Sequence, residues 1–394
     1  HLLGRRGENA QIGIRLNPEY ASIFVCENKT AAAELFIFHS EGQSSVHSGM
    51  TMSVNGCCPY QGELLPRALP PLIIIEFLLG VQANGFALWV FCWHMRPWKS
   101  STVLLFNLAL ADFFLNMVLL FRASYYLSKM DWKFGDVFCR IFLFLVALNR
   151  GSGIAFLTLI TLDRYVRVLN PHHRLNSASA ASATGAAVAV WVLTVSLNAH
   201  FLKVPQQLAV GNAMQCESFL VCLTVAPASL LSRTASFVII FLVPLALILV
   251  CSLRIISELR RRHLDHHGDM KRTISSLAMV MVVFVVCFLP SKVFQVLIWV
   301  KVWSQKSCKS VMNGVFYATL TLTYLNSILD PVLFYFSSPA FQRVCRQLVR
   351  LQNSSSQADR QDTSLIKVYG NYQLSNITYL IFCEYIFYNR KKRR

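Results

Sequence analysis

The chain has 394 residues, of which 55% are hydrophobic and only 14% are charged, whereas soluble domains carry about 25% charged residues. Its formal net charge is +18, but the Lys and Arg residues separate apolar runs instead of lying together on a solvated face. We therefore expect no nucleic-acid partner. The composition is that of a protein embedded in a membrane.

Residues 1–65 are mixed in composition and show no periodicity, which predicts an extracellular tail. They contain one glycosylation sequon, at Asn28, and a cysteine pair, Cys57 and Cys58. No charged region, apolar region and cleavage site follow one another before residue 66. We therefore expect the first apolar span to serve as the signal anchor.

Seven apolar spans follow the tail, and basic residues gather in alternate connectors. By the positive-inside rule these connectors face the cytoplasm, which places the N-terminus outside the cell. No internal repeat is visible, and this argues against transporters built from two matching halves. The predicted spans cover residues 67–93, 101–127, 136–166, 180–202, 233–258, 273–300 and 311–336.

Residues 339–351 alternate apolar and basic residues, so they predict a short amphipathic helix on the inner leaflet. Cys345 in this segment is a candidate for palmitoylation. The predicted fold class is thus an all-α membrane protein, a seven-transmembrane helix bundle with an eighth, amphipathic helix. Its parts are an extracellular tail (1–65), the bundle (66–338), helix eight (339–351) and a cytoplasmic tail (352–394).

The third span carries a cysteine, a central arginine and a terminal Asp-Arg-Tyr triplet. At a rise of about 1.5 Å per residue, Arg150 lies about 16 Å from Cys139, and Arg164 lies about 21 Å beyond Arg150. At about 100° per residue, both arginines fall within about 20° of Cys139 on a helical wheel. Charge inside a membrane usually faces a bundle interior or a wet cavity, so Arg150 is a candidate functional residue.

Isolated polar residues stand in the other spans: Asn84 in the first, Asp112 in the second, and Asn326 with Asp330 in the seventh. They can hold the bundle together through interhelical hydrogen bonds. They can also form an ion- or water-filled network that rearranges on activation, and both interpretations stay open.

Two prolines, Pro244 and Pro290, lie within the fifth and sixth spans. A proline in a transmembrane helix frees a backbone carbonyl and bends the helix, which provides a pivot. The triplet Asp163-Arg164-Tyr165 means little when it is taken alone. Its combination with Cys139 and with the polar stretches NLALAD and NSILDPVLF is far more specific.

Across residues 66–351 the chain resembles class A, rhodopsin-like G-protein-coupled receptors. Within that class it is similar to the hydroxycarboxylic acid receptors and the related oxoeicosanoid receptor. The stretches that carry the resemblance are WKSSTVLLFNLALADF, DWKFGDVFCR, NRGSGIAFLT, DRYVRVLNPHH, VCFLPS and TYLNSILDPV followed by FSSP.

The resemblance implies a role for each element of the bundle. Asp112 would be the acid of an allosteric sodium site, with Asn84, Asn326 and Asp330 in the surrounding polar network. Asp163, Arg164 and Tyr165 would meet the G protein, and Phe288 with Pro290 would form the hinge of the sixth helix. No other cofactor or metal is implied.

The resemblance also implies three disulfides. An oxidising exterior permits such bridges. Cys139 would pair with Cys216, Cys57 with Cys222, and Cys58 with Cys308. The residues alone do not determine this order, since six cysteines allow 15 pairings.

Arg150 matches the arginine that anchors the ligand carboxylate in these receptors, and a guanidinium can hold a carboxylate through two parallel charge-assisted bonds. The remaining implied ligand contacts are Tyr324, Ser218 and Lys292. Lys292 is a candidate substitute for a second arginine, which some relatives carry where Gln295 stands here. Phe334 also departs from the family, which has tyrosine at that position.

The sequence thus predicts a receptor for a small monocarboxylate or hydroxycarboxylic acid that acts through an inhibitory G protein to lower cyclic AMP, with arrestin as a further partner. Oxidised fatty acids are the alternative ligands. A carboxylate transporter is the alternative of a different class. We expect no enzyme, since no nucleophile, metal or acid/base constellation is visible.

Overall fold

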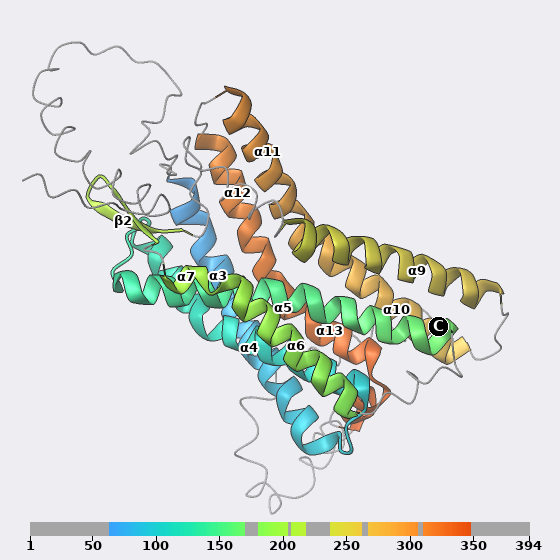
Figure 1. Cartoon of the computed structure of the whole chain (residues 1–394). Coiled ribbons are helices and arrows are strands. Elements are labelled where there is room, and N and C mark those ends of the chain that lie inside the picture. Colours follow the sequence, from blue (N-terminus) through green and yellow to red (C-terminus); the bar gives the residue numbers. More distant parts are fainter. Residues whose placement is uncertain are drawn as a thin grey trace, which may run out of the picture.

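The computed structural model describes residues 63–169, 180–203, 206–217, 237–261, 267–305 and 310–347. Within these ranges six helices are long and apolar enough to cross a membrane, and they correspond to the first six predicted spans (Figure 1). A helix suits this setting because every backbone polar group is satisfied within the segment. The six run over Leu64–His94, Ser100–Leu127, Gly135–Leu169, Ala180–Lys203, Val238–Arg261 and Lys271–Ile298.

The seventh predicted span consists of three consecutive helical elements, joined where a 3-10 turn interrupts the α-helix. The helical elements of the bundle are α3 (Leu64–Trp89) with η1 (Val90–His94), α4 (Ser100–Leu127), α5 (Gly135–Leu169), α6 (Ala180–Asn198) with α7 (His200–Lys203), η3 (Val238–Leu242) with α9 (Val243–Arg261), α10 (His267–Val283) with η4 (Phe284–Phe288) and α11 (Leu289–Gln305), and α12 (Ser310–Leu322) with η5 (Thr323–Leu325) and α13 (Asn326–Ser337).

The prolines predicted to act as pivots each follow a π-helical turn. Pro244 comes after η3, and Pro290 comes after η4. A proline ring clashes with the carbonyl of the residue four positions earlier and offers no N–H to it. Wider turns at these points relieve that clash at both predicted pivots.

Helix α5 lies at the centre of the bundle. It contacts α4, α6, α9 and α10, and Figure 1 shows it crossing the molecule between these neighbours. Helix α13 contacts α3, α4 and α10 and so closes the other side. Side chains on the inward face of α5 can therefore reach several helices at once.

The two larger clusters of the apolar core have a polar layer between them. In α4 the outer cluster includes Leu115 and the inner one Ala109, so Asp112 lies between the two. In α5 the outer cluster ends at Val146 and the inner one begins at Ile154. Asn149 and Arg150 of α5 lie between these limits. Asn84 of α3 and Asn326 and Asp330 of α13 also lie between the two clusters.

A short hairpin and a helical stretch flank the two ends of the bundle. The hairpin pairs β1 (Gln207–Val210) with β2 (Ala213–Cys216) in antiparallel register. At the other end, residues 339–347 are helical, with Phe341, Val344 and Cys345 buried and Arg343 exposed. This agrees with the amphipathic helix predicted over 339–351, of which residues 348–351 lie outside the described ranges.

Candidate functional site

Arg150 reaches from α5 to the junction between α12 and α13. Its Nε donates a hydrogen bond of 3.0 Å to Oγ1 of Thr323. Its guanidinium carbon lies 5.9 Å from the centre of the Tyr324 ring, a cation–π distance. Among the described residues no carboxylate lies within 4.0 Å of this guanidinium. The structure thus brings together Arg150 and Tyr324, two of the predicted ligand contacts, and the described residues supply no ion-pair partner for the arginine.

A second cation, Lys292, lies in the sixth helix. Lys292 is half-buried, two residues after Pro290, and its Nζ donates a 3.3 Å hydrogen bond to Oε1 of Gln295. Lys292, like Arg150, is without an ion-pair partner in the part of the chain that the structure describes. A half-buried cation without a counter-charge favours an anion beside it.

A buried ion pair closes the outer end of this region. Nη2 of Arg122, in α4, lies 2.9 Å from Oε2 of Glu217, which directly follows β2. The Tyr125 hydroxyl donates a 3.1 Å bond to the same carboxylate, and Arg122 also donates to the Tyr126 hydroxyl at 2.9 Å. Neither Arg122 nor Glu217 was predicted from the sequence to be a site residue. Arg122 could have been found by the reasoning applied to Arg150, since it is also a charge within an apolar span.

A disulfide places Glu217 over the bundle. Cys139, at the outer end of α5, is bonded to Cys216, the residue before Glu217, and this confirms one predicted pairing. Arg122 reinforces the contact by donating a 3.1 Å bond to the Cys216 carbonyl. The other predicted outer residues lie outside the described ranges: Asn28, Cys57, Cys58, Ser218, Cys222 and Cys308.

The polar layer below Arg150 is built around Asp112. Its Oδ1 accepts hydrogen bonds from Nδ2 of Asn149 at 2.9 Å and from Nδ2 of Asn326 at 3.3 Å. Oδ2 of Asp112 and both carboxyl oxygens of Asp330 are buried and make no hydrogen bond to the described residues. Asn84 joins the layer by donating a 2.7 Å bond to the Ser327 carbonyl. Carboxyl oxygens buried in this way fit a small cation such as sodium.

Sequence reasoning missed Asn149, although it links α5 to the predicted acid. Asn116 and Ser327 were also missed; the Ser327 hydroxyl donates a 3.3 Å bond to the Asn116 side chain. Each is a polar residue in an apolar span, so the signal was present. Only their neighbours in space distinguish them from residues that face the surface.

At the inner end of α5, Asp163 and Arg164 have different partners. Asp163 accepts hydrogen bonds from Ser100 at 3.0 Å and Ser101 at 2.7 Å, and it forms an ion pair with Arg167 at 3.0 Å. Arg164 instead donates a 2.8 Å bond to the Ser337 carbonyl at the end of α13. Tyr165 is half-buried and packs against the apolar contact between α9 and α10.

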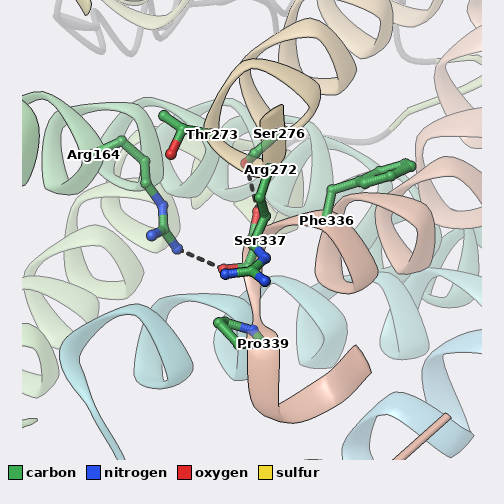
Figure 2. A pocket seen from close by; sticks show the side chains of 7 residues that line it. All are labelled: Arg164, Arg272, Thr273, Ser276, Phe336, Ser337 and Pro339. Atoms are coloured by element: carbon green, nitrogen blue, oxygen red, sulfur yellow. Dashed lines mark hydrogen bonds between the residues drawn. The ribbon is translucent and has the colours of Figure 1, made fainter. Parts of the chain in front are cut away.

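Arg164 borders a cavity of about 220 Å³ between α5, α10 and α13 (Figure 2). In this cavity the hydroxyl groups of Ser276 and Ser337 lie 2.6 Å apart and so connect α10 to α13. Arginine and hydroxyl groups make the wall polar. The cavity is lined by Arg164, Arg272, Thr273, Ser276, Phe336, Ser337 and Pro339.

The predicted hinge residues lie in the sixth helix, where η4 meets α11. Phe288 is 1% exposed and its ring contacts that of Phe284 within η4. Pro290 follows in α11. Phe334, the departure from the family pattern, packs its ring against Phe91 and Phe341 and so belongs to the apolar core.

Cys345 is 1% exposed and belongs to the inner apolar cluster. The exposure that an acyl donor needs is therefore lacking in this arrangement, and palmitoylation stays a prediction that requires residues 339–347 to move outward.

Comparison with known proteins agrees with this arrangement. Residues 83–334 match the family described as 7 transmembrane receptor (rhodopsin family). Hydroxycarboxylic acid receptor 2 of Homo sapiens is 43% identical over 297 residues, which are 74% of this chain and 80% of that protein. Hydroxycarboxylic acid receptor 1 of Homo sapiens is 40% identical over 294 residues, covering 74% and 83%. Oxoeicosanoid receptor 1 of Homo sapiens is 40% identical over 297 residues, covering 75% and 76%.

These matches confirm the predicted resemblance, and they identify a multi-pass membrane receptor, not an enzyme. The matched segment begins just before Asn84 and ends at Phe334, so it contains the polar layer, Arg150 and the Asp163-Arg164-Tyr165 triplet. The chain belongs to the rhodopsin family of seven-transmembrane, G-protein-coupled receptors.

Proposed function

We propose that the chain is a plasma-membrane receptor for small carboxylic acids that acts through an inhibitory G protein to lower cyclic AMP. Its N-terminus would lie outside the cell. The observation that carries the proposal is the cation Arg150 at the level of the polar layer, with no carboxylate among the described residues within 4.0 Å. A half-buried guanidinium without an anion is costly, so a carboxylate ligand would bind where the described residues supply no counter-charge.

The predicted ligands are monocarboxylates and hydroxycarboxylic acids, in line with the names of the relatives. Tyr324 supplies an aromatic face beside Arg150. The Arg122–Glu217 pair joins the end of the hairpin to α4.

The contacts also provide a route from the ligand to the inner face. Arg150 is bonded to Thr323, in the 3-10 turn above α13. The lower end of α13 is bonded to Arg164 through Ser337. A ligand that draws Arg150 away from Thr323 would favour a different position of α13 and release Arg164. Helix six, which turns at Phe288 and Pro290, would then open the inner cavity for the G protein, as a population shift.

Two further roles follow from the same arrangement. A sodium ion held by Asp112 and Asp330 would stabilise the inactive state, because it satisfies oxygens that make no hydrogen bond to the described residues. Arrestin would be a second partner and would bind at the inner face, beside the cavity that Arg164 borders. Both are proposals, and each is testable apart from the ligand.

The test is a cyclic-AMP assay in forskolin-treated cells. Lactate, butyrate, 3-hydroxy acids and oxo-fatty acids would be applied with and without pertussis toxin, which blocks inhibitory G proteins. The proposal predicts that at least one short acid lowers cyclic AMP and that the toxin removes the effect. A response to oxo-fatty acids alone would favour the alternative ligand class. Uptake of a radiolabelled acid without any signal would instead indicate a carboxylate transporter.

A further inference from the structure

The cavity at the inner end of the bundle has a wall of cations and hydroxyl groups. Arg164 of α5 and Arg272 of α10 both line it, together with the hydroxyl groups of Thr273, Ser276 and Ser337. None of the described residues that line this cavity is acidic. The polar side chains of the wall are therefore all able to donate hydrogen bonds, and none of them carries a negative charge.

Arg164 brings to this cavity a positive charge that the described residues do not neutralise. Its Nη2 donates a 2.8 Å bond to the Ser337 carbonyl, which is a neutral acceptor. Its Nε is buried and makes no hydrogen bond to the described residues. The adjacent acid, Asp163, pairs with Arg167 instead. Arg164 thus has no ion-pair partner in the part of the chain that the structure describes, and this favours an anion beside it.

The size of the cavity and the directions of its donors suit a tetrahedral anion. The cavity measures about 220 Å³, whereas one water needs about 10–15 Å³ of such space, so a polyatomic anion has room. Figure 2 shows Arg164 reaching toward Ser337 from α5, while Arg272 lines the same cavity from α10. Donors on three helices suit an anion whose oxygens point in several directions, and arginine binds phosphate oxygens in pairs.

We propose that this cavity binds a phosphate group between Arg164 and Arg272, and that the bound phosphate holds the receptor in its closed arrangement. A lipid headgroup and a soluble phosphate compound both carry this group, and the experiment below distinguishes them. The inhibitory effect rests on the proposed function, because it assumes that the cavity opens for a G protein. The binding itself does not depend on that assumption.

The inhibitory effect follows from the helices that the phosphate would join. Ser337 of α13 already contacts both neighbours, since it accepts a bond from Arg164 and its hydroxyl lies 2.6 Å from that of Ser276. Helices α5 and α10, however, share no ion pair among the described residues. A phosphate bound by Arg164 and Arg272 would link these two helices directly. An anion that binds the closed arrangement better than the open one shifts the population toward it.

The first measurement is thermal unfolding of the purified receptor, followed with a dye that reacts with thiols such as the buried Cys287 as they become exposed. Inorganic phosphate is compared with chloride at equal ionic strength in detergent. In a second arm, the receptor is placed in bilayer discs of phosphatidylcholine with or without phosphatidic acid. The variants are Arg272→Gln, the charge-conserving Arg272→Lys and the control Arg343→Gln, which changes an exposed arginine outside the cavity.

The proposal predicts that at least one of the two probes raises the unfolding temperature of wild type by about 2 °C or more. Arg272→Gln should remove this increase, Arg272→Lys should keep part of it, and Arg343→Gln should keep all of it. An increase with inorganic phosphate would indicate a soluble compound, and an increase with phosphatidic acid alone would indicate a lipid headgroup. No increase with either probe, or an equal increase in Arg272→Gln, would overturn the site.

The second measurement is ligand-free nucleotide exchange on a purified inhibitory G protein. The stabilising probe should slow exchange about threefold with wild type and with Arg343→Gln, and should leave the rate with Arg272→Gln unchanged. Stabilisation without any slowing would overturn the inhibitory effect. A receptor that is stabilised by the probe yet never promotes exchange, even with the acids tested above, would contradict the proposed function and leave the phosphate site supported.

Discussion

Breaking the buried pair between Arg122 and Glu217 should destabilise the bundle more than any other loss of a single charge. Only 5% of the Arg122 side chain and 1% of the Glu217 side chain are exposed. Glu217→Gln removes the negative charge, nearly conserves the shape, and leaves the guanidinium buried without a counter-charge. Removing one partner of a buried pair costs about 3–5 kcal/mol.

The matched control is the pair between Arg67 and Glu63, whose side chains are 80% and 83% exposed. Exposed pairs contribute at most about 1 kcal/mol, so Glu63→Gln should change stability by no more than that. The double variant Arg122→Met, Glu217→Met replaces both buried charges with apolar groups. It should recover most of the stability that Glu217→Gln loses, since no buried charge remains.

The assay is unfolding of the purified receptor by a denaturing detergent, which gives a free energy of unfolding for each variant. A cost of less than about 1 kcal/mol for Glu217→Gln, as small as that of Glu63→Gln, would refute the reasoning. The reasoning would also be refuted if the double variant lost as much stability as the single variants Arg122→Met and Glu217→Met lose together. Such additive losses would show that the two charges do not depend on each other.

Three further predictions concern the inner half and the polar layer. Ser276→Ala removes the 2.6 Å bond to Ser337, so ligand-free inhibition of cyclic AMP should rise about two- to tenfold; unchanged basal signalling would contradict this. Trp191→Phe removes the 2.8 Å bond from its indole to Asn107, and thermal unfolding should show a loss of about 1 kcal/mol. Asp112→Asn should abolish any effect of sodium on agonist affinity, and a sodium effect that persists would place the ion elsewhere.

Much of the fold could be predicted because the membrane makes the sequence signal strong. Apolar runs of the required length predicted the six helices that have clear spans, and Pro244 and Pro290 mark where π-helical turns occur in the fifth and sixth helices. The seventh span was predicted as well, although the 3-10 turn that interrupts it was not. Arg150 and Asp112 were found because a charged residue in an apolar membrane helix is costly and is therefore usually functional.

The partners of those residues could not be predicted, because they depend on contacts between distant segments. Glu217 lies in a connector, where an acid is unremarkable, and only the disulfide to α5 carries it over Arg122. Asp163 stands next to Arg164 in the sequence, yet it pairs with Arg167 one turn further along α5. The adjacency of Asp163, Arg164 and Tyr165 in the sequence identified the triplet, but it did not predict which groups form hydrogen bonds or ion pairs.

The most direct test of the account asks whether Arg150 recognises the carboxylate of the ligand. The measurement is the potency of an active acid and of its primary amide, which has nearly the same shape without the charge, in wild type and in Arg150→Gln. The control is Arg140→Gln, on the same helix, because Arg140 already pairs with Asp136. In wild type and in the control, the acid should be about 10- to 100-fold more potent than the amide.

In Arg150→Gln this difference should vanish, since a neutral side chain distinguishes little between the two ligands. An acid that keeps its full advantage over the amide in Arg150→Gln would contradict the account and would place the anchor for the carboxylate elsewhere in the bundle.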